Sequence, residues 1–460
     1  MAQARFGTDG VRGVANEELT AELALALGRA AARVLPAPTF VVGRDTRRSG
    51  PLLQAAFSAG LATEGADVVD LGVLPTPGVA AVAEQRKVPG AVISASHNPF
   101  GDNGIKLFSR LGTKLPTDIE GEIERELDSI LADPDRSPQR PTGYAVGQIT
   151  VDPEAVELYT AHLAATTEGR RLAGLSIVVD CAHGAASDIA PQVFEDLGAQ
   201  VIALHHTPDG VNINEKCGST DPSELSLAVV EREADLGLAF DGDADRVIAV
   251  DHTGTIVDGD VLLALFALDL AERGRLAANT VAVTVMTNLG LRLAMEERGI
   301  TVLETDVGDR HVLAALDADG LSLGGEQSGH IIFRSLSTTG DGILTGIALA
   351  DLVLRAGRPL AELSQGLVEK VPQCLVNVPI PQPERLADCA EVWEAVVKAE
   401  AELGHEGRVL LRPSGTEPKV RVMVEARDEA QANAVAARLA GVVEATLGQS
   451  EPHRHPGSPR

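Results

Sequence analysis

A strand–loop–helix–strand unit recurs three times along the chain, and this repetition constrains the fold more than any other feature. The copies begin with the apolar stretches FVVG (40–43), SIVVD (176–180) and VAVTV (281–285). In each copy a loop, a helical segment and a glycine precede a second apolar strand. This order is typical of βαβ folds, in which glycine ends the helix. Because the copies return at intervals of roughly 100 to 135 residues, they predict three related α/β domains with mixed or parallel sheets.

The last part of the chain has a different pattern. A proline-rich joint at 378–386 is followed by a helical segment, two short strands around RPSGTEP (412–418), and a long helix over 428–447. This order predicts a smaller C-terminal α+β domain. The expected organisation comprises α/β domains at 1–147, 148–252 and 253–368, the α+β domain at 369–448, and a disordered tail at 449–460.

Composition and charge exclude several classes of function. The chain carries 39 basic and 66 acidic side chains, a net charge of −27, and only 3% of its residues are aromatic. Such a surface repels nucleic acid and anionic membranes and offers few rings on which bases could stack. A small anionic substrate is compatible with this charge only if basic residues gather locally.

Cysteine usage and hydropathy indicate a reducing compartment. The longest apolar runs, such as VLLALFAL (261–268), are too short to span a bilayer, and the first residues lack the apolar core of a signal peptide. The four cysteines form no C-x-x-C pair, so neither a disulfide framework nor a zinc knuckle is indicated. We therefore expect a cytoplasmic protein with reduced thiols and no membrane partner.

The stretch SASHNPFGDNGIKLF (94–108) follows an apolar segment that is typical of a buried strand end. Loops at strand ends are where α/β proteins place their reactive groups. Ser96 is the neighbour of His97, and adjacent side chains in an extended loop point apart, so His97 is not expected to act as its base. A serine without a base, but with Lys106 in the same stretch, could instead carry a phosphoryl group.

Three aspartates alternate along the loop DGDADR between two apolar strands. If the loop curls, Asp241, Asp243 and Asp245 converge, and a cation among them would relieve their repulsion. Hard oxygen ligands favour magnesium or calcium. An EF-hand is excluded because Arg246 stands where that loop requires glycine and His252 where it requires glutamate. The alternative is a polar turn with solvated aspartates.

The loop GGEQSGH (324–330) carries three polar side chains in a glycine frame: Glu326, Ser328 and His330. Glutamate and serine on one side of an extended segment could bond neighbouring sugar hydroxyls. A structural turn is the alternative.

The turn RPSGTEP offers a different chemistry. Arg412 supplies a planar fork for phosphate, and Ser414, Gly415 and Thr416 could complete a nest of hydroxyl and N–H donors. A merely capped turn is the alternative. The chain has no Gly-Lys pair, so ATP hydrolysis by a P-loop is not supported.

The four stretches SASHNP, DGDADR, GEQSGH and RPSGTEP occur in this order in the α-D-phosphohexomutases, and the chain resembles that superfamily from FGTDGVRG at Phe6 to its last helix. Within the superfamily it most resembles the bacterial phosphoglucosamine mutases, because of FGTDGVRG, the whole 94–108 stretch and the glutamine in GEQSGH. The resemblance implies four domains around a central cleft, three of them α/β and the fourth a separate fold.

The resemblance also implies roles for individual residues. Ser96 would be the phosphorylated nucleophile and donor, and Glu326 and Ser328 would bind sugar hydroxyls. The acid/base would be either His330 or Lys106. The remaining implied residues are the magnesium ligands Asp241, Asp243 and Asp245 together with Ser96, the phosphate-binding residues Arg412, Ser414, Gly415 and Thr416, and the reacting-centre residues Arg12, Lys106, Arg246 and His330.

The implied reaction interconverts glucosamine 6-phosphate and glucosamine 1-phosphate, a step towards UDP-N-acetylglucosamine and peptidoglycan. It would need one Mg²⁺, phosphorylated Ser96, and glucosamine 1,6-bisphosphate as intermediate and activator. A small-molecule amino-sugar phosphate is the expected partner of a monomer or homodimer. Two alternatives stay open: a phosphomannomutase/phosphoglucomutase, and a non-catalytic regulator that binds sugar phosphates.

Overall fold

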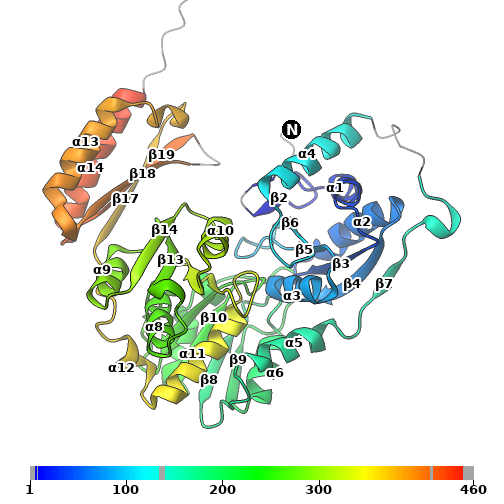
Figure 1. Ribbon diagram of the computed structural model, residues 1–460, viewed down its shortest axis with the longest axis horizontal. Helices are drawn as coiled ribbons and strands as arrows, with labels where there is room; N and C mark the ends of the chain where they lie inside the picture. The colour runs from blue at the N-terminus through cyan, green and yellow to red at the C-terminus, as the bar shows by residue number, and fades with distance from the viewer. Residues whose placement is uncertain (1–5, 8, 134–139, 415–417, 449–460) are drawn as a thin grey trace, which may run out of the picture. The chain divides into compact units, whose positions relative to one another are not determined.

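The computed structural model describes residues 6–7, 9–133, 140–414 and 418–448 (Figure 1). The chain divides into two compact units, Met1–Met286 with Gly299–Leu367 (unit 1) and Thr287–Arg298 with Val368–Arg460 (unit 2). The predicted fold class is confirmed: the chain has three α/β sheets and a smaller C-terminal α+β domain. The described ranges contain no helix with the length and apolarity that crossing a membrane requires.

The first domain is a seven-stranded mixed sheet in the order β1-β2-β6-β5-β3-β4-β7. Phe40 and Val42 of β3 point into a core shared with helices α1, α2 and α4, while Val41 lies beside Val79 of α3 on the opposite face. This alternation is expected of a strand that is covered on both sides. The elements are β1 (Phe6–Gly7), β2 (Gly10–Val14), α1 (Ala21–Val34), β3 (Thr39–Arg44), α2 (Gly50–Thr63), β4 (Asp67–Val73), α3 (Thr76–Arg86), β5 (Gly90–Ile93), β6 (Asp102–Phe108), α4 (Thr117–Ala132) and β7 (Ile149–Val151).

The second domain has a five-stranded sheet in the order β12-β11-β10-β8-β9. Its central strands are apolar and buried, β10 along its whole length and β8 in all but its first residue, as parallel strands covered on both faces require. The elements are α5 (Ala155–Ala165), β8 (Ser176–Asp180), α6 (Ile189–Asp196), β9 (Gln200–Leu204), α7 (Ser223–Glu231), β10 (Leu236–Phe240), β11 (Val247–Asp251) and β12 (Ile256–Val257).

The third sheet has four strands in the order β14-β13-β15-β16. Its elements in unit 1 are α8 (Gly259–Glu272), β13 (Thr280–Thr284), β14 (Thr301–Thr305), α10 (Asp309–Asp319), β15 (Leu323–Gly325), β16 (Ile331–Phe333), α11 (Gly342–Ala356) and α12 (Leu360–Ser364).

The three sheets share one strand order, which explains where the functional loops lie. The orders β6-β5-β3-β4, β11-β10-β8-β9 and β16-β15-β13-β14 each place three parallel strands beside one antiparallel strand. Three loops each connect the outer parallel strand to that antiparallel neighbour: the serine loop (94–101), the aspartate loop (241–246) and the loop at 326–330. The three loops are therefore the same connection in three copies of one unit.

The predicted glycine helix ends are confirmed in all three copies. Gly65, Gly198 and Gly299 follow α2, α6 and α9 (Leu289–Glu297), and each has a positive φ (95°, 100° and 69°). This left-handed conformation is one that glycine adopts without steric cost.

Unit 2 is an antiparallel sheet, β17-β19-β18, with two helices packed on it. The predicted pair of strands is present, but a third strand, β17, covers the start of the segment that we expected to be a joint. Its elements are α9 (Leu289–Glu297), β17 (Gln373–Pro379), α13 (Ala390–Leu403), β18 (Arg408–Pro413), β19 (Lys419–Glu425) and α14 (Glu429–Leu447).

Helix α9 groups with unit 2 by its contacts, although the expected third domain, 253–368, contains it. Asn288 Nδ2 donates to Glu425 Oε1 (3.0 Å) and Leu289 N donates to Glu425 Oε2 (3.1 Å). A buried carboxylate that satisfies the helix N-terminus holds α9 to the C-terminal sheet. The four domain boundaries stay predictions, and the expected disordered tail lies outside the described residues.

Candidate active site

Ser96 lies at the carboxyl end of β5 in a strained backbone conformation. It is buried and has a positive φ of 51°, which is uncommon for a residue with a side chain. Its N–H donates to Ser94 Oγ (2.9 Å), and its carbonyl accepts from Arg47 Nη2 (2.8 Å). These bonds fix the backbone from which the hydroxyl projects.

Arg47 organises the serine loop and was not singled out from the sequence. Its guanidinium is fully buried and pairs with Asp45, and it donates to the carbonyl oxygens of Ser96, Asn98, Pro99 and Asp102. Asp45 in turn accepts from Ser94 Oγ (2.6 Å). The only sequence signal was a charged GRDTR segment directly after a buried strand.

The three aspartates converge, as predicted for a metal site. Asp241, Asp243 and Asp245 are buried, and one oxygen from each lies within 4.8 Å of the others. Ser96 Oγ donates to Asp241 Oδ2 at 2.5 Å, so the serine from β5 meets the aspartate loop from β10. Gly242 permits this approach, because a Cβ there would lie 2.6 Å from the Ser96 carbonyl oxygen.

The electrostatics of this cluster fit a divalent cation. Burial and the neighbouring Asp245 and Asp243 raise the pKa of Asp241 well above its ordinary value. Asp243 Oδ1 has no hydrogen-bond partner among the described residues, although it is buried. Buried carboxylate oxygens with strong mutual repulsion are suited to a hard metal ion such as Mg²⁺.

Basic side chains gather around the aspartates. The acidic chain therefore has the local group of basic residues that an anionic substrate requires. Lys106 Nζ lies 2.9 Å from Asp243 Oδ2, and Arg246 Nε lies 3.7 Å from Asp245 Oδ1. His330 Nδ1 lies 3.6 Å from Asp245 Oδ1. Arg12 joins the cluster through Asp9, with which its guanidinium pairs and which lies 3.4 Å from Lys106 Nζ. Arg12 also donates to Asn98 Oδ1. The four predicted reacting-centre residues therefore lie in one cluster.

The two acid/base candidates are both protonated at neutral pH in the metal-free protein. Burial lowers the pKa of Lys106, but the adjacent Asp243, Asp9 and Asp245 outweigh it and raise that pKa. Burial likewise opposes the charge of His330, and Asp245 raises its pKa to about 9. Both side chains therefore carry a proton, and His330, whose pKa lies closer to neutral pH, releases it more readily than Lys106.

The prediction that the side chains of Ser96 and His97 point apart was wrong. The loop is not extended at Ser96, and His97 Nδ1 lies 3.3 Å from Ser96 Oγ. Burial and the nearby Arg246 and Arg12 lower the pKa of His97 to about 4, so its imidazole is neutral at pH 7. The serine hydroxyl nevertheless has its shortest contact to Asp241.

Asp9, Lys114 and Asp309 form an ion-pair chain that the sequence did not reveal. Lys114 Nζ lies 2.6 Å from Asp9 Oδ1 and 2.6 Å from Asp309 Oδ2, so it links the first and third domains of unit 1. Burial would raise the pKa of Asp9, but Lys106, Lys114 and Arg12 lower it well below its ordinary value. Asp9 belongs to the FGTDGVRG stretch, which was the one available signal.

The loop at 326–330 packs against the aspartate loop. Val247 N donates to the carbonyl of Gly329 (3.1 Å), and a Cβ on Gly329 would lie 2.0 Å from the Val247 carbonyl oxygen. Ser328 Oγ donates to Glu326 Oε2 (3.3 Å), so the two predicted sugar-binding side chains point toward each other. Glu326 Oε1 also accepts from Gly308 N (3.2 Å).

In unit 2, the predicted phosphate residues are only partly described. Arg412 faces Arg421 across β18 and β19, and burial together with Arg421 lowers the pKa of Arg412. Ser414 Oγ is buried with no hydrogen-bond partner among the described residues. Two arginines at paired positions of neighbouring strands suit an anion. Gly415 and Thr416 lie outside the described residues.

Comparison with known proteins decides the family. Four domain profiles of phosphoglucomutase/phosphomannomutase match residues 3–133 (alpha/beta/alpha domain I), 157–254 (alpha/beta/alpha domain II), 258–371 (alpha/beta/alpha domain III) and 375–442 (C-terminal domain). The chain belongs to this family. As a phosphohexomutase, it is an isomerase.

Relatives extend the comparison to individual phosphohexomutases. A phosphoglucosamine mutase of Corynebacterium efficiens is 52% identical over 95% of this chain and 98% of its own. A phosphoglucomutase/phosphomannomutase family protein of Burkholderia thailandensis superposes with a TM-score of 0.78, at 26% identity over 95% of this chain and 97% of its own. An N-acetylphosphoglucosamine mutase of Aspergillus fumigatus, solved with GlcNAc-6P and magnesium, shares the fold at a TM-score of 0.67 and 18% identity, covering 97% and 96% of the two chains.

Proposed function

We propose that this chain interconverts glucosamine 6-phosphate and glucosamine 1-phosphate as a phosphoglucosamine mutase, with Ser96 as the residue that carries the phosphoryl group. The observation that carries the proposal is the contact of Ser96 Oγ with the buried carboxylate cluster, in a chain about half identical to a phosphoglucosamine mutase over nearly its whole length. A serine held against a cation site is suited to bear a phosphate dianion.

The aspartates and Ser96 would hold one Mg²⁺. When bound, the ion neutralises negative charge on the phosphoserine and on the group being transferred. Asp241, Asp243 and Asp245 supply the oxygen ligands, and Lys106 fixes Asp243 in place through its 2.9 Å contact. Chelator treatment should abolish turnover, and adding Mg²⁺ should restore it.

The transfer itself breaks the bond between Ser96 Oγ and phosphorus and forms a bond from phosphorus to a sugar hydroxyl. The product of this step is glucosamine 1,6-bisphosphate, which also serves as activator. After it turns over, its other phosphoryl group returns to Ser96. Arg246 and Arg12 stabilise charge on the transferring group, while positioning supplies most of the remaining rate enhancement.

The sugar and the second phosphate require separate contacts. Glu326 and Ser328 bind ring hydroxyls, and Arg412 and Ser414, with Gly415 and Thr416, bind the phosphate that is not reacting. The proton that the sugar hydroxyl loses as it takes the phosphoryl group has to reach Ser96 Oγ. His330 or Lys106 would relay it, by giving a proton to Ser96 Oγ and receiving the proton of the sugar hydroxyl. Separate kcat–pH profiles of His330→Gln and Lys106→Gln would assign it, because loss of the acid removes one limb of the profile.

We further propose a cytoplasmic monomer or homodimer that feeds UDP-N-acetylglucosamine synthesis. Free thiols at all four cysteines are consistent with a reducing compartment.

The decisive experiment compares turnover of glucosamine 6-phosphate with turnover of glucose and mannose phosphates. A clear preference for the amino sugar supports the proposal, and equal rates would favour a broad phosphomannomutase/phosphoglucomutase. Ser96→Ala should abolish turnover without unfolding the protein. A folded Ser96→Ala protein with wild-type turnover would exclude the phosphoserine mechanism.

A further inference from the structure

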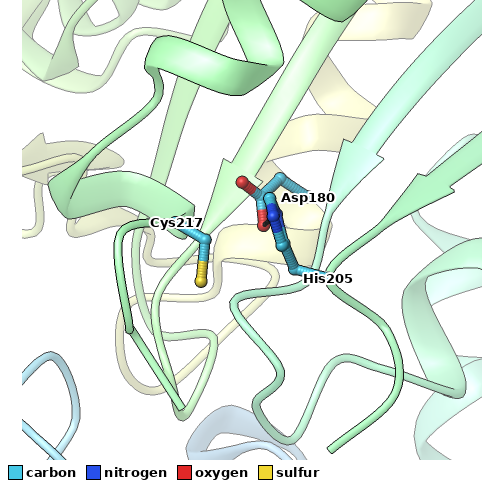
Figure 2. Close-up of side chains that lie close together, drawn as sticks. All are labelled: Asp180, His205 and Cys217. Carbon is cyan, nitrogen blue, oxygen red and sulfur yellow. Dashed lines mark ion pairs between the residues drawn. The ribbon is translucent and has the colours of Figure 1, made fainter. Parts of the chain in front are cut away.

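A second group of metal-ligating side chains lies in the second domain, apart from the aspartate loop. Asp180 ends β8, His205 directly follows β9, and Cys217 lies in the segment between β9 and β10. Figure 2 shows the imidazole of His205 beside the carboxylate of Asp180, with the thiol of Cys217 close to both. One ligand atom from each of the three lies within 4.8 Å of the others.

The carboxylate in this group is held in place by the backbone. Asp180 is fully buried, and its oxygens accept from Ala182 N (2.9 Å) and Gly218 N (2.8 Å). Each carboxylate oxygen has a second lone pair, so these bonds orient the group without exhausting it. Cys217 is also fully buried, and no disulfide involves it.

The histidine has a different environment at each ring nitrogen. His205 Nδ1 lies 3.1 Å from Asp180 Oδ1, and Nε2 lies 3.3 Å from Glu224 Oε2 on the exposed side. A metal-bound imidazole commonly donates its other N–H to a carboxylate, which fixes the ring and its tautomer. Glu224 can accept the N–H of Nε2, while Nδ1 faces Asp180.

The spacing is close to that of a tetrahedral ion. Bonds of about 2.0–2.1 Å to nitrogen and oxygen put two tetrahedral ligands about 3.4 Å apart. The distance of 3.1 Å between His205 Nδ1 and Asp180 Oδ1 is near that value. Since the whole set lies within 4.8 Å, a side-chain shift of about 1 Å would close it around an ion.

We propose that Asp180, His205 and Cys217 form a second metal site, which binds Zn²⁺. Thiolate and imidazole select zinc or a chemically similar late transition ion, whereas the all-carboxylate aspartate loop selects magnesium. Water would complete the coordination. The site goes beyond the proposed mutase activity and does not depend on it.

Such an ion would stabilise the support of the serine loop. Asn214, three residues before Cys217, donates through Nδ2 to the carbonyl oxygens of Ser96 (2.9 Å) and Asn98 (3.1 Å). His183 N donates to the carbonyl of His205, and the His183 carbonyl accepts from Thr46 Oγ1 (2.6 Å). Zinc would therefore tie together the ends of β8 and β9 and the segment that carries Asn214.

The test titrates Co²⁺ and then Zn²⁺ into chelator-treated full-length protein with Mg²⁺ in excess, so that magnesium occupies the aspartate loop. Cobalt bound to a thiolate gives an intense near-ultraviolet charge-transfer band, which carboxylate sites do not give. We expect this band to saturate at one equivalent, Zn²⁺ to abolish it, and Zn²⁺ to raise the melting temperature.

Variants assign the ligands. Cys217→Ser and His205→Gln should each weaken cobalt binding at least about 10-fold and lose or reduce the band. Cys181→Ala, which changes a neighbouring buried cysteine outside the cluster, should keep it. Circular dichroism before metal addition identifies a variant that has misfolded, and the second variant then decides. Absence of a saturating band, or a band that persists in both ligand variants, would overturn the proposal.

Discussion

At the residue scale, the site depends on buried charges that have partners on other elements. Arg47 has a fully buried guanidinium, and it bonds the carboxylate of Asp45 and four backbone carbonyl oxygens. Lys106 is 1% exposed and faces three acids. Such groups are tolerated in the interior only when they are paired, so their removal affects more than one function.

Arg47→Lys should lower kcat by at least about 10-fold while leaving the protein folded, because one ammonium cannot replace a fork that holds four carbonyls. The expected cause is a displaced Ser96. Steady-state kinetics and phosphoserine content measure it. Arg48→Lys, at the exposed neighbouring position, is the matched control. Equal kcat values for the two variants would show that Arg47 does not position the loop.

Lys106→Met should destabilise the protein by about 3–5 kcal/mol without metal, since it leaves buried carboxylates unpaired. Magnesium should raise the melting temperature more in this variant than in the wild type, because the ion would replace the missing positive charge. Thermal unfolding with and without Mg²⁺ measures both effects. Lys398→Met, at an exposed lysine, should change neither. A magnesium effect equal to that of the wild type contradicts the explanation.

At the element scale, helix ends connect the parts of unit 1. Asp341 is the N-cap of α11 and accepts from Leu344 N (2.9 Å). It also accepts from the hydroxyl of Tyr159 on α5 (3.0 Å). One buried carboxylate therefore caps one helix and anchors another.

This anchor should make stability depend on pH. Burial raises the pKa of Asp341 to about 7 from its ordinary value of 3.8, so the folded state binds the proton more tightly than the unfolded state. The stability that protonated Asp341 contributes is fully present below pH 3.8, the ordinary pKa, and is lost as the pH rises through about 7.

Asp341→Asn should flatten this part of the stability–pH curve, because an amide keeps an acceptor oxygen and cannot titrate. Urea midpoints measured across the interval from 3.8 to about 7 would show it. Asp118→Asn, at an exposed position of α4, should retain the wild-type slope. An unchanged slope in Asp341→Asn would mean that another group causes the pH dependence.

At the scale of the whole molecule, the residues of the proposed reaction come from both units. Unit 1 holds the serine, the aspartates and the loop with Glu326, while unit 2 holds Arg412 and Ser414. The bisphosphate must present both of its ends to one serine, so the residues that bind the non-reacting phosphate must serve two orientations of the sugar.

Arg412→Ala should weaken substrate binding roughly 30-fold or more, from a loss of about 2–4 kcal/mol for a charged, partly desolvated contact. Free glucosamine 1,6-bisphosphate should accumulate, because the intermediate escapes before its second transfer. Single-turnover quenching of phosphorylated enzyme with labelled sugar phosphate measures both. Arg427→Ala, at an exposed arginine of the same unit, is the control. Wild-type binding with no released intermediate would show that Arg412 has a structural role in the turn at 412–418 and does not bind phosphate.

The repeated α/β units, the glycine helix ends and the stretches that carry the site could be predicted from the amino-acid sequence. Hydrophobic period and turn chemistry are local properties, so each strand and loop could be read from the residues within it. The convergence of the three aspartates was predicted for the same reason, since they lie within five residues. The strand β17 was missed because it runs into the proline-rich segment 378–386, and pairing with β19 decides its conformation.

Contacts between side chains that lie far apart in the sequence could not be predicted and are known from the three-dimensional structure. Thr76 and Asp243 are 167 residues apart and bond at 2.6 Å, and Ser96 and Asp241 are 145 apart. The hold of Arg47 on the serine loop, the chain Asp9–Lys114–Asp309 and the group Asp180–His205–Cys217 depend on the same kind of proximity. The order of strands in a sheet brings such residues together, and it follows from packing and pairing over the whole domain rather than from any local pattern.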